Sequence, residues 1–430
     1  MPDGEVIVAT DTDLPVPAVV SRLRIDIYTQ DGQWLATRDD VRPDRRDWPT
    51  SFSLYHDDPS NEGVALVRLR AYPEGRLIRY TGIVYAAYQE LLHGAPVGNG
   101  QPRLVIDGQD RTPEFEPDPL VTIDRVVRVR LSYGKVGRIQ VLLTGDCAGR
   151  MPQLSTWTEA RSCIDASREL WPIDDEPVEP ATGALNDSRA GTWGLSPCPA
   201  GSDTSSPRVC IPGGGFILGD AFFLGSDGLG GALPLHPRPE RIVRISRFEL
   251  ERDEVSVGQY RSALAAGLVP PVAVGVYEKD GPPGADPSYS CTFSASPRDR
   301  EGYPLSCVSW STARAYCRFM AGDLPTEAQF EYAAVAAGGL SKTSYPWGEQ
   351  PPDCSRAVYA RSYAYADCLA QGAGVQPLQS GLAELHPLGL HNLVGSLREH
   401  VLDTLAPYTD ACWTSAPVID PACLLAPREG

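Results

Sequence analysis

Long apolar runs are absent from this chain of 430 residues, since none approaches the roughly 18 residues of a membrane-spanning helix. Basic residues are scarce relative to acidic ones, with 38 Lys and Arg against 55 Asp and Glu and a net charge of −17. Nucleic acids and anionic membranes bind clustered Lys and Arg, so this balance argues against both as partners. The start, MPDGEVIVAT, lacks the basic residues and apolar stretch of a signal peptide.

Several catalytic and metal-binding motifs are also missing. The sequence contains no HExxH, GxSxG or CxxC, and the PGGG of Pro212–Gly215 lacks the GK[ST] of a phosphate-binding loop. The six His do not cluster near cysteines, and His56 and His93 lack the spacing of an iron site. These absences exclude the commonest zinc, hydrolase and nucleotide sites.

Cysteine, by contrast, is plentiful, with eleven residues. Ten fall into local pairs that each bracket a loop-like segment: Cys147 and Cys163, Cys198 and Cys210, Cys291 and Cys307, Cys354 and Cys368, and Cys412 and Cys423. Local pairs around loops are typical of disulfides formed in an oxidising compartment, and reduced thiols in loops are the alternative. We therefore expect an extracytoplasmic protein, secreted or lipoprotein-anchored, whose leader is absent from this sequence.

Residues 1–146 show the alternation of apolar and polar side chains that is typical of half-buried strands. Turn residues between strand pairs predict three hairpins: Arg22–Tyr28 with Gln33–Thr37, Val64–Tyr72 with Arg76–Tyr80, and Val126–Tyr133 with Arg138–Leu143. Short strands with frequent turns predict an antiparallel β-sandwich domain over residues 1–146. Residues 147–207, rich in Pro, acidic and small polar residues, predict a disulfide-tied linker.

Residues 208–430 form the second predicted domain, in which three helices can be located. Ser256 with Gln259, and Thr326 with Gln329, have the spacing of capping boxes. Ser309 can cap a third helix that runs to about Ala321. On the helix after Thr326, an apolar face is predicted from residues three and four apart, namely Phe330, Ala333, Ala334 and Ala337. Elsewhere Pro, Gly and short apolar pieces predict little regular structure.

Six segments of this half occur in a distinctive order: IPGGGFILGD at 211–220, DEVSVGQY at 253–260, PLSCVSWSTARAYC at 304–317, LPTEAQFEYAA at 324–334, YPWG at 345–348 and GLHNLVGSLREHV at 389–401. This half of the chain resembles the formylglycine-generating enzyme (sulfatase-modifying factor) family. The resemblance implies a C-type-lectin-like fold with little regular structure, and hence an α+β protein behind an N-terminal β-sandwich. It also implies an oxidase that converts a sulfatase cysteine to formylglycine, with copper held by two cysteines.

Two departures from the family pattern bear on activity. The chain has no RGGSW, the motif that precedes the family's two active-site cysteines. Cys412 and Cys423 follow instead, in the stretch ACWTSAPVIDPACL, which does not match the catalytic segment. A copper pair is one interpretation of these two cysteines, and a disulfide is the interpretation that we favour. The catalytic residues therefore stay unknown, and a truncated C-terminus is one explanation.

The second departure lies in Gly395–His400, GSLREH, where the family has a sequence close to GNVWEW. The resemblance implies that this segment supplies backbone carbonyls and a carboxylate to calcium, which makes Gly395, Leu397 and Glu399 candidate metal ligands. Ser396 replaces the family's Asn, while Arg398 and His400 replace its two Trp. Because calcium takes six to eight oxygens, one carboxylate is a weak basis for the site.

The unpaired Cys317 shares a predicted helical face with Trp310, Ala313 and Met320, which favours a small core residue over a reactive nucleophile. Three functions remain open. The first is a non-catalytic or C-terminally incomplete binding or structural module with an extracellular protein or glycan ligand. The second is a formylglycine-generating oxidase that uses copper. The third, a cytosolic enzyme with a reactive thiol, has the least support.

Overall fold

The computed structural model describes residues 4–30, 34–56, 62–79, 105–106, 109–110, 112–153, 160–173, 178–181, 183–200, 206–220, 237–278, 291–337, 339–362, 366–379 and 386–425. The chain forms two compact units. The first unit is Met1–Leu195 with Gly215–Arg244, and the second is Ser196–Gly214 with Ile245–Gly430. The predicted linker is therefore divided, with residues up to Leu195 in the first unit and residues from Ser196 in the second.

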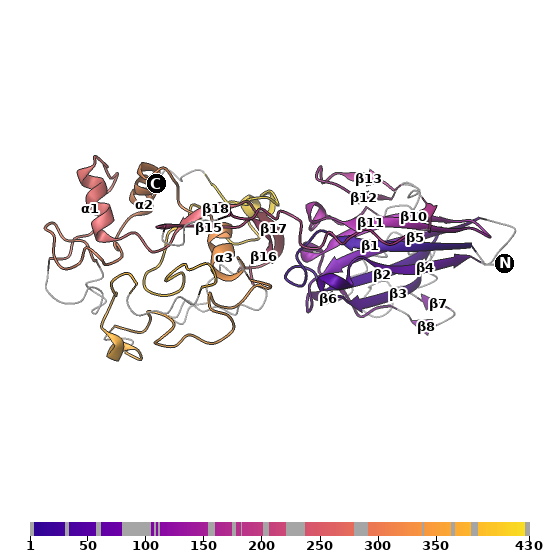
Figure 1. Ribbon diagram of the computed structural model, residues 1–430, viewed down its shortest axis with the longest axis horizontal. Coiled ribbons are helices and arrows are strands. Elements are labelled where there is room, and N and C mark those ends of the chain that lie inside the picture. Colours follow the sequence, from indigo (N-terminus) through magenta and orange to yellow (C-terminus); the bar gives the residue numbers. More distant parts are fainter. Residues whose placement is uncertain are drawn as a thin grey trace. The chain divides into compact units, whose positions relative to one another are not determined.

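The first unit is built on two four-stranded sheets (Figure 1). One has the strand order β14 (Glu179–Pro180), β11 (Val136–Leu143), β1 (Gly4–Thr12) and β4 (Thr50–His56); the other has the order β10 (Ile123–Leu131), β5 (Gly63–Tyr72), β2 (Arg22–Thr29) and β3 (Trp34–Val41). All pairs are antiparallel except β1 with β11, which run parallel. This β-rich unit agrees with the predicted sandwich.

Pairing within the sheets confirms one of the three predicted hairpins and corrects the other two. β2 pairs with β3 antiparallel, although the turn at residues 31–33 lies outside the described residues. β6 (Leu77–Arg79) pairs with β9 (Phe115–Pro117) and not with β5. β10 and β11 lie in different sheets, because the turn between them carries the chain from one sheet to the other. Local turn residues fix a reversal of the chain, but burial of the strand faces chooses the partner strand.

One face of the β10-β5-β2-β3 sheet buries charged side chains. Arg68 forms a bidentate pair with Asp124, with its Nε 2.9 Å from Oδ1, and both residues are buried. Arg70 lies 2.6 Å from Asp26, which is fully buried and also contacts Arg24 at 3.4 Å. Buried ion pairs are costly to desolvate, but breaking one leaves a charge with no partner. Removing any one of these charged side chains should therefore leave another charge buried without its partner.

Short two-stranded pairs complete the first unit and its edge. They are β7 (Val105–Ile106) with β8 (Gln109–Asp110), β12 (Arg161–Cys163) with β13 (Leu170–Pro172), and β16 (Gly214–Leu218) with β17 (Arg241–Ile245). The disulfide between Cys147 and Cys163 links β12 to the segment that follows β11.

The described residues of the second unit form one strand pair and four α-helices, so the chain as a whole is α+β. β15 (Arg208–Ile211) pairs with β18 (Phe248–Glu251), and the helices are α1 (Val257–Ala265), α2 (Trp310–Phe319), α3 (Glu327–Val335) and α4 (Ala411–Thr414). Both predicted capping boxes are present: Ser256 and Thr326 each accept a hydrogen bond from the backbone N–H of the Gln three residues on. Ser309 caps α2 as predicted.

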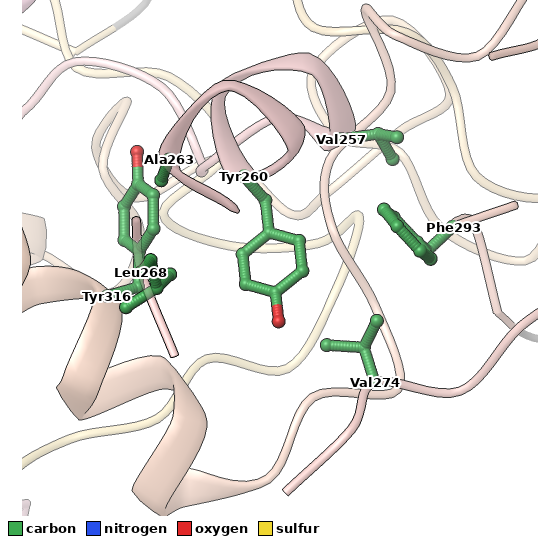
Figure 2. Close-up of a cluster of buried hydrophobic side chains, with 7 residues drawn as sticks. All are labelled: Val257, Tyr260, Ala263, Leu268, Val274, Phe293 and Tyr316. Atoms are coloured by element: carbon green, nitrogen blue, oxygen red, sulfur yellow. The ribbon is translucent and has the colours of Figure 1, made fainter. Parts of the chain in front are cut away.

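The core of the second unit is a cluster around Tyr260 (Figure 2). The ring of Tyr260 points from α1 into the middle of the cluster, with its centroid 5.7 Å from that of Phe293 and 6.3 Å from that of Tyr316 on α2. Val257, Ala263, Leu268 and Val274 complete the buried set. On α3, the predicted face is largely confirmed, because Ala333, Ala334 and Ala337 are buried. Tyr260, Tyr316 and Phe330, one from each of these three helices, also line a cavity.

Candidate functional site

A cavity of about 420 Å³ lies within the second unit. Its lining comes from β18 and the residues that follow it, from α2 with the loop to Pro325, and from residues 391–400. Directly after α2, Ala321 takes a left-handed backbone conformation with a φ of 61°. The cavity therefore forms where irregular segments meet the helical core, and we refer to it below as the cavity.

Apolar and aromatic side chains make up much of the cavity wall. Tyr260 and Tyr316, both members of the buried cluster, line it together with Leu305, Met320 and Phe330. Burial raises the pKa of Tyr316 to about 12, with the charge of Glu251 as the next cause, so this phenol stays neutral. A wall of this kind suits the apolar part of a ligand.

Two carboxyl groups, Glu254 and Glu399, face this wall. Glu254 is half-buried, and burial raises the pKa of its carboxyl although its Oε2 accepts a hydrogen bond of 3.1 Å from Asn392. For Glu399, burial between the cavity walls, followed by repulsion from Glu254, raises the pKa to about 8. The residue as a whole is exposed, so water that reaches it moderates this shift.

Other charged groups of the cavity have partners. His391 lies 2.7 Å from Asp253, and Asp323 lies 2.8 Å from Arg314. The guanidinium of Arg208 donates to the carbonyl of Met320 at 2.7 Å. Two further basic residues, Arg398 and His400, line the same cavity as Glu254 and Glu399.

Buried polar atoms next to Glu254 lack hydrogen-bond partners among the described residues. They are Oδ1 of Asn392 and Oγ of Ser396, and the hydroxyl of Ser396 lies close enough to the carboxylate of Glu254 to lower its pKa. A buried polar atom that is left unpaired costs free energy, so such atoms commonly mark a place where a ligand or ion binds. The sequence analysis missed Glu254 and Asn392, although Asn392 lies only three residues before Gly395.

The three predicted metal ligands have different surroundings in the structure. Leu397 and Glu399 line the cavity, whereas Gly395 packs against the backbone of Val358 with a φ of 105°. Within the described ranges, no three His, Cys, Asp or Glu side chains come together in a way that could hold a metal ion. Oδ1 of Asn392 adds one suitable oxygen to the set. Calcium at Gly395, Leu397 and Glu399 stays a prediction.

The single free thiol, Cys317, also faces the cavity. It is half-buried, and burial, followed by the charge of Glu251, raises its pKa to about 11. The helical face predicted for it is wrong in part, because Trp310 and Met320 are exposed and the buried face of α2 carries Thr312 and Tyr316. Cys317 packs at the edge of the core cluster as a protonated thiol.

The ten remaining cysteines form five disulfides: Cys147–Cys163, Cys198–Cys210, Cys291–Cys307, Cys354–Cys368 and Cys412–Cys423. This confirms every predicted local pair. Asp403 supports the last of them, because its carboxylate accepts hydrogen bonds from the backbone N–H of Cys423 at 2.6 Å and of Glu327 at 2.7 Å. Cys412 and Cys423 therefore present no thiolate pair to copper in this oxidised form.

Comparison with known proteins identifies the family. Residues 198–421 match the family described as "Sulfatase-modifying factor enzyme 1-like domain". The chain is 30% identical to the formylglycine-generating enzyme of Thermomonospora curvata over 50% of its own length and 76% of that protein. The corresponding enzyme of Streptomyces coelicolor is 27% identical, over 50% of this chain and 73% of that protein.

A third relative is described as inactive. The "Inactive C-alpha-formylglycine-generating enzyme 2" of Bos taurus is 34% identical over 24% of this chain and 33% of that protein. Both active and inactive members are thus among the relatives. The match at residues 198–421 spans just over half of the 430 residues, and the chain belongs to the sulfatase-modifying factor enzyme 1-like family.

Proposed function

We propose that this protein is a non-catalytic binding module of its family that works outside the cytoplasm. The observation that carries the proposal is the Cys412–Cys423 disulfide, which occupies the two cysteines nearest to the C-terminal end of the family match. The remaining thiol, Cys317, keeps its proton at neutral pH because its pKa is about 11, and a thiol is a poor nucleophile and a poor metal ligand.

An oxidising compartment is supported by the five disulfides, since such bonds form and persist outside the cytosol. Secretion and lipoprotein anchoring both meet this requirement. Among the described residues, no helix has both the length and the apolar character that crossing a membrane requires. An extracellular protein or a glycan is the class of partner that this location supplies.

The competing function is a formylglycine-generating oxidase that acts on a sulfatase cysteine. The identity of 30% to the Thermomonospora curvata enzyme favours it, because the matched part covers 76% of that protein. Copper would need two thiolates, and soft thiolates are the ligands that select Cu(I). The oxidised cysteines of this structure do not fit such a site, so we derive no catalytic step through copper.

A thiol count separates the two functions. The full chain is denatured without reductant, labelled with a maleimide, and mapped by mass spectrometry. We expect one label, on Cys317, and no label on Cys317→Ala. Labels on Cys412 and Cys423, together with Cu(I) binding that Cys412→Ala abolishes, would instead support the oxidase. Alkylating the thiols inside the producing cells before lysis shows whether the same pattern holds in the compartment.

A further inference from the structure

We propose that the second unit has a separate site for a small polar ligand with a carboxylate, such as a sugar acid, and that Arg361 binds the carboxylate. This inference rests on the proposed binding function and names the chemistry of the ligand. Three observations carry it: a pocket apart from the cavity, the burial of Arg361, and the hydrogen-bond donors that this side chain leaves unused.

The pocket is large enough for a small molecule. Its volume of about 480 Å³ lies in the range of roughly 300–1,000 Å³ that is usual for ligand sites. Arg361 lines it together with Val358, Asp367, Val375 and Ser396, and none of these residues lines the cavity. We refer to it below as the Arg361 pocket.

The chain around the Arg361 pocket is held by backbone hydrogen bonds. The N–H of Ser396 donates to the carbonyl of Val358 at 2.8 Å, and the N–H of Gly374 donates to the carbonyl of Arg361 at 2.6 Å. The Cys354–Cys368 disulfide closes the loop on which Arg361 lies. A pocket that is held in this way before the ligand arrives has a lower ordering cost of binding.

Arg361 is a buried cation without a carboxylate partner in the described part of the chain. Only 8% of the residue is exposed, and burial lowers the pKa of its guanidinium with no nearby carboxylate to raise it. Asp367, the acidic residue among the described lining, is exposed. Buried charges are normally paired, because taking a charge out of water is costly. An anionic ligand would supply the missing partner.

The hydrogen bonds of Arg361 leave one edge of its guanidinium largely unused. Nη1 donates to the carbonyl of Gln371 at 3.1 Å, and Nη2 donates to the carbonyl of Cys354 at 3.4 Å. Nε is buried and has no hydrogen-bond partner among the described residues. Of the five N–H groups of a guanidinium, two are therefore used. The edge formed by Nε and Nη2 has a single long bond.

Arg68 in the first unit shows what this edge of a guanidinium binds. Its Nε lies 2.9 Å from Oδ1 of Asp124, and its Nη2 contacts Oδ2 of the same carboxylate. Two parallel N–H groups match the two oxygens of a carboxylate, and this bidentate arrangement is the strong form of the pair. At Arg361, no carboxylate of the described residues takes that place, so the geometry selects a carboxylate from a ligand.

The rest of the lining suits a polar ligand body. Ser362 and Ser396 contribute hydroxyl groups, and Tyr359 is the one aromatic residue among the described lining. The cavity, in contrast, has the aromatic wall described above. Hydroxyls of a sugar acid can bond with such a lining, and glycans are among the partners that the proposed function allows. The positive charge of Arg361 disfavours a metal ion in this pocket.

The test is calorimetric titration of the full oxidised chain with D-glucuronate, in a buffer of low salt without other oxyanions. D-glucose is the neutral match, D-glucosamine is the cationic one, and inorganic sulfate is the competitor for a simple anion site. We expect glucuronate to bind at least tenfold more tightly than any of the three, because only glucuronate combines the carboxylate with a body that fills the pocket.

Variants then locate the site. Arg361→Lys keeps the positive charge but loses the edge of Nε and Nη2, so it should weaken glucuronate at least tenfold. Arg318→Lys, at an exposed arginine of the same unit, should leave the affinity unchanged. Asp367→Asn removes an exposed negative charge from the lining and should tighten glucuronate without changing the affinity for glucose.

A second measurement keeps the native side chain in place, since Arg361 also bonds two carbonyls of its loop. In the wild-type protein labelled with nitrogen-15, glucuronate should shift the Nε–H resonance of Arg361, which Arg361→Lys identifies by its loss. The Nε–H resonance of Arg318 should not move. A resonance of Arg361 that stays in place while glucuronate binds would put the ligand elsewhere.

Three further results would overturn the inference: no preference for glucuronate over glucose, glucuronate binding that Arg361→Lys leaves intact, or sulfate that binds as tightly as glucuronate. Each leaves the proposed function untouched provided that Cys412 and Cys423 resist labelling. Labelling of those two cysteines would instead remove the proposed function, whatever glucuronate does.

Discussion

The two units of this protein hold their structure by different means. The first unit relies on two four-stranded sheets with continuous backbone pairing, on buried ion pairs, and on one disulfide. The second has one short strand pair and helices of at most ten residues, but it holds four disulfides. Each of those four closes a loop with a sequence separation of 11 to 16 residues.

The difference shows what covalent links make possible. A disulfide stabilises mainly by limiting the freedom of the unfolded chain, so the folded chain does not need regular hydrogen bonding at that place. Loops fixed in this way can present side chains from many directions, and two of them supply lining residues to the cavity, namely Arg208 between Cys198 and Cys210 and Leu305 between Cys291 and Cys307. Sheets offer fewer choices, because a strand directs its side chains alternately to two faces.

Full reduction of the disulfides should produce the largest difference in stability between the two units. Each small loop contributes about 3 kcal/mol, so loss of four disulfides should unfold the second unit. We expect the amides of α1, α2 and α3 to exchange freely with deuterium in reductant, while those of β1 and β11 stay protected. The control is Cys147→Ser with Cys163→Ser, which should keep sheet protection. Loss of protection in β1 along with the helices would contradict this division.

In the first unit, the largest single-residue effect is expected at the buried ion pair. Asp124→Ala leaves the guanidinium of Arg68 buried without its carboxylate, which should cost about 3–5 kcal/mol of unfolding free energy. Denaturant unfolding should show this loss in the first unit alone. Arg46→Ala, which removes an exposed pair with Asp44, is the matched control and should change nothing measurable. Equal losses in both variants would remove the role assigned to burial.

A pH-dependent effect is expected in the second unit at Glu327. Burial, then the charges of Glu331 and Asp403, raises the pKa of Glu327 from 4.5 to about 7. Between these values the folded state holds a proton that the unfolded state has lost, so stability is full below about pH 4.5 and falls as the pH rises toward 7. In Glu327→Gln, the loss of unfolding free energy with rising pH should be smaller by on the order of 2 kcal/mol. This value already includes a reduction for the water that reaches the carboxyl.

Unfolding free energies at pH 5 and pH 8 test this dependence, with Asp299→Asn as the control because that carboxylate is exposed and distant from α3 in sequence. If the wild type and Glu327→Gln lose the same stability between these pH values, the proton is not held at Glu327.

The smallest effects should come from the helix caps of the second unit. Thr326→Ala and Ser256→Ala each leave backbone N–H groups of a first turn unpaired, which should cost about 1 kcal/mol each. Thr326→Ser should recover most of the loss, since it keeps the hydroxyl. Ser341→Ala, an exposed position outside the helices, should show no change, and a loss there as large as at the caps would exclude capping as the cause.

The parts of the fold that depend on neighbouring residues could be predicted from the sequence. Caps such as Ser256 and Thr326, the strand alternation at Arg22–Thr29, and the local cysteine pairs all involve residues within sixteen positions of each other. Strand partners could not be predicted in this way. β10 and β11 are adjacent in sequence but lie in different sheets, because their apolar faces are buried against strands far along the chain.

The residues of the candidate site also differ in whether they could be located from the sequence. Leu397 and Glu399 could be located from the resemblance to the family, and both line the cavity. Glu254 lies in the segment 253–260 that carries the resemblance, but it could not be singled out there, because it meets residues 391–400 only through the fold. Helical periodicity assigned Cys317 to the core. The residue is only partly buried in the structure, because the chain packed against this side of α2 is irregular. Periodicity does not describe irregular chain.

The order of the disulfides has a consequence for the way in which the protein is made. Every disulfide joins two cysteines that are consecutive in the sequence, with Cys317 as the odd residue between Cys307 and Cys354. In an oxidising compartment, each cysteine of an emerging chain would therefore meet its correct partner before the next pair exists. The one position where synthesis order offers a wrong partner is Cys317, and once the second unit has folded, burial raises the pKa of this thiol to about 11, which slows its exchange with the disulfides. The arrangement favours correct oxidation with little later rearrangement.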